Sequence, residues 1–293
     1  MNALAEDTRL ANGLAPSRTL SPREFKLFQR LIHEEAGIYL SEAKQALLVG
    51  RLSRRLRALG LTSFGDYYER VVAGDPEERI RMLDCICTNE THFFREPQQF
   101  TYLETTLIPE WRAEGPGRTI RVWSAACSTG EEPYSLAMLL LRHFPPSSGF
   151  RIEILASDLS TRALSRAQEG VWPIERKEEI PEAFLKRFML RGQGRHAGQM
   201  KAGDEIRDVV RFARVNLNDD DLGVGGPFDL VFCRNVLIYF DAPSKAAVIR
   251  RLLKRMSPKS HLFLGHAESL LGFGEWLRRV GPTVYRPEPG ACA

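Results

Sequence analysis

Apolar residues in the first third of the chain recur at spacings of three and four, the pattern of amphipathic helices. Residues 22–36 show this spacing after Ser21, which suits a helix N-cap. A second helix is expected from a cap at Ser41 to Gly60, and two more over residues 63–74 and 76–89. The pattern predicts a small all-helical domain over residues 19–85.

The pattern changes after residue 117 to short apolar runs that alternate with helical periods. Strands are expected at residues 119–126, 150–160, 210–217, 228–240 and 261–267, and helices at 131–144, 161–172 and 242–256. Such alternation predicts an α/β domain over residues 118–290, with a mainly parallel sheet covered on both faces. A glycine-rich stretch at about 190–212 does not fit the alternation, and a small β insertion is expected there.

Composition limits the possible classes of protein. The 293 residues are 43% hydrophobic and 27% charged, which suits a folded soluble protein of roughly one or two domains. The net charge of +4 is too weakly basic to predict a nucleic-acid binder. No apolar run approaches the ~20 residues that span a bilayer. Residues 1–18 resemble no secretory signal and are expected to form a disordered tail. The five cysteines lack metal or redox spacing, which favours reduced thiols in a cytoplasm.

The turn after the first expected strand is the most informative stretch, "VWSAACSTGEEPYS" at residues 122–135. Its small residues let a ligand approach the backbone, but the dinucleotide glycine fingerprint is absent. Glu131 and Glu132 stand where a phosphate would otherwise lie. Either they only cap a helix, since acids are favoured at its start, or one of them meets a positive ligand group such as an ammonium.

Asp158 directly follows the second apolar run, where an acid can accept hydrogen bonds from both hydroxyls of a ribose. The alternative is a helix N-cap, but Ser160 can serve as that cap. A ligand with a ribose and an ammonium but no phosphate suggests S-adenosylmethionine.

Further polar residues lie at the fourth strand and in the segment before the sheet. Arg234 and Asn235 follow an apolar run, and Tyr239 comes about one turn later. Arg234 either forms a structural ion pair or orients an anionic substrate or the cofactor. Residues 86–117 are expected to be a linker, in which "TNETHFFRE" could be a simple structural connection.

A basic strip is expected on the second helix, where Arg51, Arg54 and Arg55 share one face. It is either a solvated face or a docking surface for an acidic partner helix. His266 is expected to be structural, and no cluster of residues with metal-ligand spacing is present in the sequence.

Taken together and in order, these motifs resemble the CheR-type chemoreceptor glutamate methyltransferases. The resemblance rests on the helical N-terminal domain, "TNETHFFRE", "VWSAACSTGEEPYS", "ASDLSTRAL", "FMLRGQG", "VNLND", "FDLVFCRNVLIYF" and "GHAESL". It covers nearly the whole chain after the tail. One departure is Cys127, in a run of small residues that is more often alanine-like in such proteins.

The resemblance implies a Rossmann-like S-adenosylmethionine-dependent methyltransferase sheet and methyl transfer to receptor glutamates, giving glutamyl 5-O-methyl esters. Its cofactor contacts would be Asn89, Thr91, Arg95, Glu131, Asp158, Asn216, Leu217, Arg234 and Asn235. Arg234 and Tyr239 would handle the substrate carboxylate, and the basic strip would meet acidic receptor helices. The β insertion would be the family's subdomain that can tether a receptor tail, and nothing in the sequence demands more than a monomer.

Two other functions remain open at this stage. A nicotinamide-dependent oxidoreductase on a similar sheet is disfavoured by the missing glycines and the paired acids. A non-catalytic receptor-binding adaptor would retain the fold but transfer no methyl group.

Overall fold

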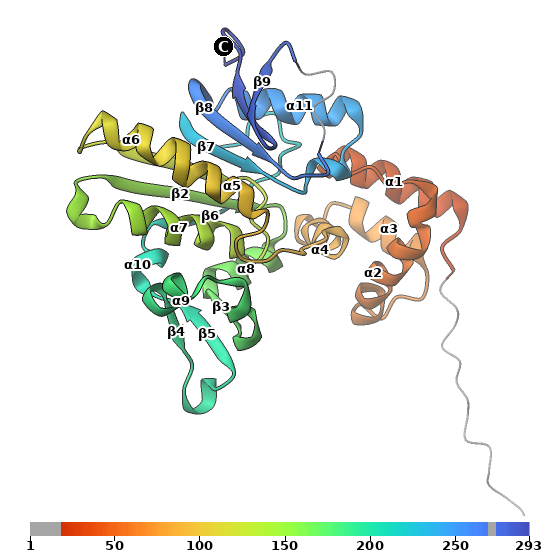
Figure 1. The fold of residues 1–293 in the computed structure, drawn as a ribbon. Helices are drawn as coiled ribbons and strands as arrows, with labels where there is room; N and C mark the ends of the chain where they lie inside the picture. Colours follow the sequence, from red (N-terminus) through yellow and green to blue (C-terminus); the bar gives the residue numbers. More distant parts are fainter. Residues whose placement is uncertain (1–18, 269–273, 293) are drawn as a thin grey trace, which may run out of the picture. The chain divides into compact units, whose positions relative to one another are not determined.

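A computed structural model describes residues 19–268 and 274–292 (Figure 1). The predicted disordered tail, residues 1–18, lies outside the described part. The chain divides into two compact units, one ending at Ile86 and the other containing residues 87 onward. Residues 31–40 group with the second unit. No helix in the described residues is long and apolar enough to cross a membrane.

The helical unit is built from α1 (Pro22–Ala36), α2 (Gln45–Ala58), α3 (Phe64–Val72) and α4 (Pro76–Ile86). Ser21 caps α1 as predicted: its hydroxyl accepts the Glu24 N–H at 3.2 Å, and the Glu24 carboxylate accepts the Ser21 N–H at 2.8 Å. The predicted cap at Ser41 is wrong. Ser41 makes no side-chain cap and precedes a short 3₁₀ turn, after which α2 begins at Gln45.

The second unit contains a seven-stranded sheet of order β6-β2-β1-β7-β8-β10-β9. Its strands are β1 (Thr119–Ser124), β2 (Arg151–Asp158), β6 (Val210–Arg214), β7 (Phe228–Cys233), β8 (Met256–Leu264), β9 (Leu277–Gly281) and β10 (Val284–Pro287). The five strands from β6 to β8 pair in parallel, while β10 pairs antiparallel with β8 and β9. The five predicted strands are confirmed, and β9 and β10 were not predicted.

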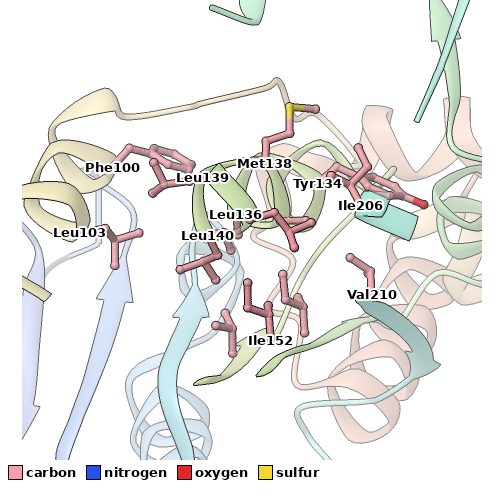
Figure 2. Close-up of a cluster of buried hydrophobic side chains, with 14 of the residues drawn as sticks. Phe100, Leu103, Tyr134, Leu136, Met138, Leu139, Leu140, Ile152, Ile206 and Val210 are labelled. Atoms are coloured by element: carbon pink, nitrogen blue, oxygen red, sulfur yellow. The ribbon is translucent and has the colours of Figure 1, made fainter. Parts of the chain in front are cut away.

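Alternation along the strands divides the core between the two faces of the sheet. On β7, Leu230 and Phe232 join one buried cluster, and Val231 and Cys233 join the other. The first face is covered by α5 (Pro97–Tyr102), α6 (Ile108–Glu114) and α7 (Glu131–His143), and the second by α11 (Ala242–Leu253). Figure 2 shows side chains of α7 between the sheet residue Ile152 and Phe100 of α5. Residues Tyr134–Leu141 are all buried, since α9 and α10 also pack on α7.

A second, three-stranded sheet of order β3-β5-β4 lies between α8 (Thr161–Glu169) and β6. Its strands are β3 (Val171–Pro173), β4 (Met189–Arg191) and β5 (Gln199–Ala202), and both pairings are antiparallel. The short helices α9 (Glu182–Phe188) and α10 (Asp204–Arg207) complete this insertion. An antiparallel insertion was predicted, but its predicted bounds of about 190–212 are wrong. The sheet begins earlier, and residues 210–214 form an edge strand of the large sheet, because their apolar side chains pack on that core.

Candidate functional site

The site lies at the carboxyl ends of the parallel strands, where the strand order reverses on either side of β1. The turn from β1 to α7 has a backbone that few side chains tolerate. At Gly130, with φ of 98°, an added Cβ would lie 3.0 Å from the Ala167 Cβ. Ser128 also has positive φ, and its buried hydroxyl has no hydrogen-bond partner among the described residues. An unpaired buried hydroxyl is costly, so this turn is suited to a polar ligand atom.

Asp158 ends β2 and faces this turn. Its carboxylate accepts the Ser128 N–H at 2.8 Å and the Ser160 N–H at 2.9 Å. The α8 N-terminus is capped by Ser160, whose hydroxyl accepts the Ala163 N–H at 3.2 Å. The prediction that Ser160 serves as the cap is therefore confirmed. The two N–H groups fix the orientation of the Asp158 carboxylate at the end of β2.

The paired acids at the start of α7 have different surroundings. Glu132 accepts the Ser124 hydroxyl at 2.7 Å and lies 3.0 Å from the Arg234 guanidinium. Glu131 accepts the Thr129 hydroxyl at 2.7 Å, and its other oxygen lies 3.4 Å from Arg176. Burial raises the pKa of both carboxyl groups above the ordinary range. Since Glu132 is held by Arg234, Glu131 is the better candidate of the two for a ligand ammonium.

Arg234 lies at the end of β7 with its side chain only 2% exposed. It donates to Glu132, lies 3.3 Å from the Glu96 carboxylate, and donates to the Arg95 carbonyl at 2.6 Å. The structural ion pair, which sequence reasoning kept as the alternative, is therefore present. Two carboxylates already neutralise this guanidinium, which argues against direct binding of a substrate carboxylate by Arg234.

The loop after β7 is held by a residue that sequence reasoning missed. Glu268 accepts the backbone N–H groups of Asn235 at 2.9 Å and Leu237 at 2.7 Å. Asn235 has positive φ, and its side chain packs against Gly265, where an added Cβ would lie 2.6 Å from its amide nitrogen. Glu268 lies in the "GHAESL" motif, of which sequence reasoning singled out only His266, and His266 is exposed. The last two residues of that motif lie outside the described residues.

Tyr239, the second predicted catalytic residue, belongs to the same loop. It ends the 3₁₀ turn Leu237–Tyr239, is half-buried, and its carbonyl accepts the Tyr39 N–H at 2.8 Å. Tyr239 is thus on the segment that Glu268 holds, five residues after Arg234.

The predicted linker residues are fastened to this site. The Asn89 amide lies 3.4 Å from the Ser160 hydroxyl, and the Thr91 carbonyl accepts from Arg176 at 2.9 Å. Arg95 bonds through its side chain to Glu90 and through its carbonyl to Arg234. These contacts show that the segment is more than a simple structural connection, because it is bonded to the insertion and to the ends of β2 and β7.

Asn216 and Leu217 follow β6. The residue before them, Val215, donates its N–H to the Asp158 carbonyl at 3.1 Å, which places this segment beside the end of β2. Leu217 is buried. The Asn216 amide donates to the Glu35 carbonyl at 2.7 Å, so this side chain braces its loop.

Backbone strain concentrates at the same place. Among the described non-glycine residues, Phe94, Glu96, Ser128 and Asn235 combine positive φ with positions in the linker, the first turn or the β7 loop. Such conformations cost on the order of 1–3 kcal/mol each and persist where surrounding contacts enforce them.

In the helical unit, the predicted basic strip does not act as one surface. Arg55 donates to Glu78 through Nε at 2.7 Å, and Glu78 is completely buried. Arg51 donates to the Ile86 carbonyl. Arg54 and Arg57 are the exposed cations of this helix. Any docking surface on α2 must therefore depend mainly on Arg54 and Arg57.

The site's chemistry fits S-adenosylmethionine. It offers an oriented carboxylate for a ribose at Asp158, an unpaired buried hydroxyl at Ser128 and an anionic group at Glu131. Carboxylates at this turn would repel the phosphates of a dinucleotide. Across the described part of the chain, no cluster of His, Cys, Asp or Glu could hold a metal ion.

Comparison with known proteins decides the family. Residues 89–286 match the family described as "CheR methyltransferase, SAM binding domain", and residues 23–87 match "CheR methyltransferase, all-alpha domain". The chain belongs to the CheR methyltransferase family. The SAM-binding domain spans all nine predicted cofactor contacts, and S-adenosylmethionine is the cofactor of this methyltransferase. The resemblance, the fold class and the cofactor predicted from sequence are thereby confirmed.

Relatives cover nearly the full chain. Chemotaxis protein methyltransferase 2 of Pseudomonas aeruginosa is 39% identical over 267 residues, covering 90% of this chain and 92% of that protein. The chemotaxis protein methyltransferase of Escherichia coli is 38% identical, covering 91% of each chain. A solved magnesium protoporphyrin IX methyltransferase from Synechocystis with bound SAM is 16% identical with a TM-score of 0.33, covering 75% of this chain and 87% of that one; this likeness is too distant to bear on function.

Proposed function

We propose that this CheR methyltransferase transfers a methyl group to glutamate side chains on the cytoplasmic helices of chemoreceptors, forming glutamyl 5-O-methyl esters. The observation that carries the proposal is the meeting of Asp158, Ser128 and Glu131 at the carboxyl ends of β1 and β2, inside the family's SAM-binding domain. Full-length similarity to chemotaxis methyltransferases supports the receptor as substrate. It also argues against an adaptor without activity.

In this proposal the residues of the chain bind and align rather than exchange protons. When bound, S-adenosylmethionine supplies a methyl group on a positively charged sulfur, which is a good leaving group. A substrate glutamate is already ionised near neutral pH, so no residue has to act as a base. Asp158 holds the ribose and Glu131 the ammonium, while the linker residues Asn89, Thr91 and Arg95 close the pocket. Alignment of the two reactants then supplies the rate.

The sequence predicted that Arg234 and Tyr239 together handle the substrate carboxylate; in this proposal they have different roles. Arg234 forms ion pairs with Glu132 and Glu96 and holds the β7 loop in place. Tyr239 follows on that loop and is the candidate to contact the substrate carboxylate. Asn235, Asn216 and Leu217 complete the cofactor pocket around the strand ends.

Receptor contacts are proposed at two further places. Arg54 and Arg57 on α2 would attract acidic receptor helices. In the insertion, β4 is an edge strand with Leu190 56% exposed, which suits addition of an extended receptor tail as a further strand. Such a protein would act in the cytoplasm, as a monomer.

The test is methyl transfer to a defined acceptor. The full chain is incubated with S-adenosylmethionine and a receptor cytoplasmic fragment, and modified peptides are located by mass spectrometry. A matched fragment with its acceptor glutamates changed to glutamine is the control. Methylation confined to glutamates of the first fragment supports the proposal, whereas methylation of other residue types, or none although the cofactor binds, contradicts it.

A further inference from the structure

The insertion contributes one charged side chain to the wall of the cofactor site. Arg176 lies on the 3₁₀ segment Ile174–Glu179, which follows β3. One of its terminal nitrogens donates to the Thr91 carbonyl at 2.9 Å, and the other lies 3.4 Å from the Glu131 carboxylate. Arg176 therefore joins the linker to the start of α7 from a third element.

Glu179, on the same segment, completes this connection. Its carboxylate accepts from Arg176 at 2.8 Å and from the Phe93 N–H at 2.9 Å. Two consecutive parts of the linker, at Thr91 and Phe93, are thus tied to one turn of the insertion. Glu179 also holds the Arg176 guanidinium by an ion pair, since the two residues lie three positions apart on the same turn.

We propose that Arg176 is a positioning residue of the cofactor site, which holds the Glu131 carboxylate and the Thr91 backbone in the geometry that S-adenosylmethionine requires. The inference rests on the proposed roles of Glu131 and Thr91 as cofactor contacts. It adds a residue from the insertion, outside the turn, strand ends and linker that the sequence singled out.

The chemistry favours arginine at this position. The guanidinium presents several donors in a rigid plane and reaches two carboxylates and a carbonyl at once, which a lysine ammonium on a flexible stem does less well. Glu131 is only 1% exposed, and a nearby cation favours the ionised form that a ligand ammonium needs. The Arg176 side chain is itself 32% exposed, so one part of it reaches solvent while its guanidinium lies 3.4 Å from Glu131.

The experiment is a double-mutant cycle on cofactor affinity. Kd for S-adenosylmethionine is measured by calorimetry for the full chain and for Arg176→Gln, Arg176→Lys, Glu131→Gln and the double variant Arg176→Gln/Glu131→Gln. Arg191→Gln, an exposed arginine on β4, is the matched control. Thermal unfolding of each variant checks folding.

Arg176→Gln is expected to raise Kd about tenfold, the scale of a hydrogen bond to a charged group, and Arg176→Lys to restore part of the affinity. In the Glu131→Gln background the same change is expected to cost less than about threefold, because contacting residues are not additive. An unchanged Kd in Arg176→Gln overturns the proposal. An equal loss in both backgrounds also overturns it, since Arg176 would then act only as a structural brace.

A failure of the proposed function can be distinguished from a failure of the proposed role of Arg176. Wild-type protein that binds S-adenosylmethionine with the expected cycle but does not methylate receptor glutamates would leave the role of Arg176 standing and remove the proposed substrate. If the wild-type chain did not bind the cofactor, both would be overturned.

Discussion

The Arg234 guanidinium donates to the Glu132 carboxylate at 3.0 Å and thereby joins the end of β7 to the first turn of α7. Glu96, from the linker, lies 3.3 Å away on the other side. The arrangement explains how an arginine can end a buried strand, since its charge is compensated within the protein. It also connects three of the segments that form the proposed cofactor site.

Replacing Arg234 with alanine should therefore destabilise the fold. Glu132 and Glu96 would remain buried without their cation, and breaking a buried pair by removing one partner costs about 3–5 kcal/mol. The free energy of unfolding is measured with urea. Arg211→Ala, on an exposed position of β6, is the control and should change it by less than about 0.5 kcal/mol. A loss below about 1 kcal/mol in Arg234→Ala would show that the pair is not a major stabilising element.

Asp158→Asn should weaken cofactor binding with a smaller effect on stability. The amide group can no longer accept two ribose hydroxyls while facing the N–H groups of Ser128 and Ser160. We expect Kd for S-adenosylmethionine to rise about tenfold or more. Glu153→Gln serves as control, because Glu153 is an exposed residue on the same strand whose contact with Arg121 is a surface pair. Equal Kd values for Asp158→Asn and the control would exclude Asp158 from the ribose site.

Acidification should weaken cofactor binding through Glu131. Burial raises the pKa of this carboxyl group above the ordinary 4.5, although the Thr129 hydroxyl, the Glu131 N–H and Arg176 oppose the shift and Glu179 adds to it. An ammonium needs the ionised form, so affinity should begin to fall at a pH above that of an ordinary glutamate. The experiment is a series of Kd measurements at decreasing pH, with Glu131→Gln as reference.

Acidification should change the contribution of Glu131 to the free energy of unfolding in the opposite direction from its contribution to cofactor affinity. A carboxyl group whose pKa is raised in the folded state binds its proton more readily there than in the unfolded chain, so protonating Glu131 does not destabilise the fold. The expected signature is weaker cofactor binding on acidification together with a free energy of unfolding that gains a favourable contribution in the wild-type chain and lacks it in Glu131→Gln. If Glu131→Gln retains the full pH dependence of Kd, another group is responsible.

On α2, exposed and internally paired arginines should behave differently. Charge reversal at Arg54 and Arg57 is expected to raise KM for a receptor fragment, most strongly at low salt, and to leave unfolding unchanged. Arg55→Glu should instead lower the unfolding free energy, because it places a second acid beside the buried Glu78. An unchanged KM after reversal of Arg54 and Arg57 at low salt would exclude this face from receptor docking.

Sequence periodicity predicted most of the fold because local pattern carries that information. The apolar runs of β1 and β7 and the N-cap at Ser21 are local features, and both were predicted. By contrast, β9 (LRRVG) and β10 (VYRP) are short and interrupted by arginines, and Val171 and Trp172 of β3 were predicted to end a helix. Their strand pairing depends on distant partners, which a single sequence does not reveal.

The candidate site was predictable only where motif and position coincide. Asp158 and Glu131 stand at strand and helix ends that the pattern locates. The contacts of Glu268 with Asn235, and of Arg176 with Thr91, join residues more than 30 positions apart. The pairing of Arg55 with Glu78 could not be separated from a solvated helix face for the same reason.

The most direct test of the central claim is the chemical nature of the methyl group transferred. The full chain is incubated with methyl-labelled S-adenosylmethionine and a chemoreceptor cytoplasmic fragment, and the washed fragment is then treated with mild base. We predict that the label is on the fragment and is released by base as methanol, as a glutamyl methyl ester requires. Label that resists base, or no label from protein that binds the cofactor, would contradict the assignment of a glutamate O-methyltransferase.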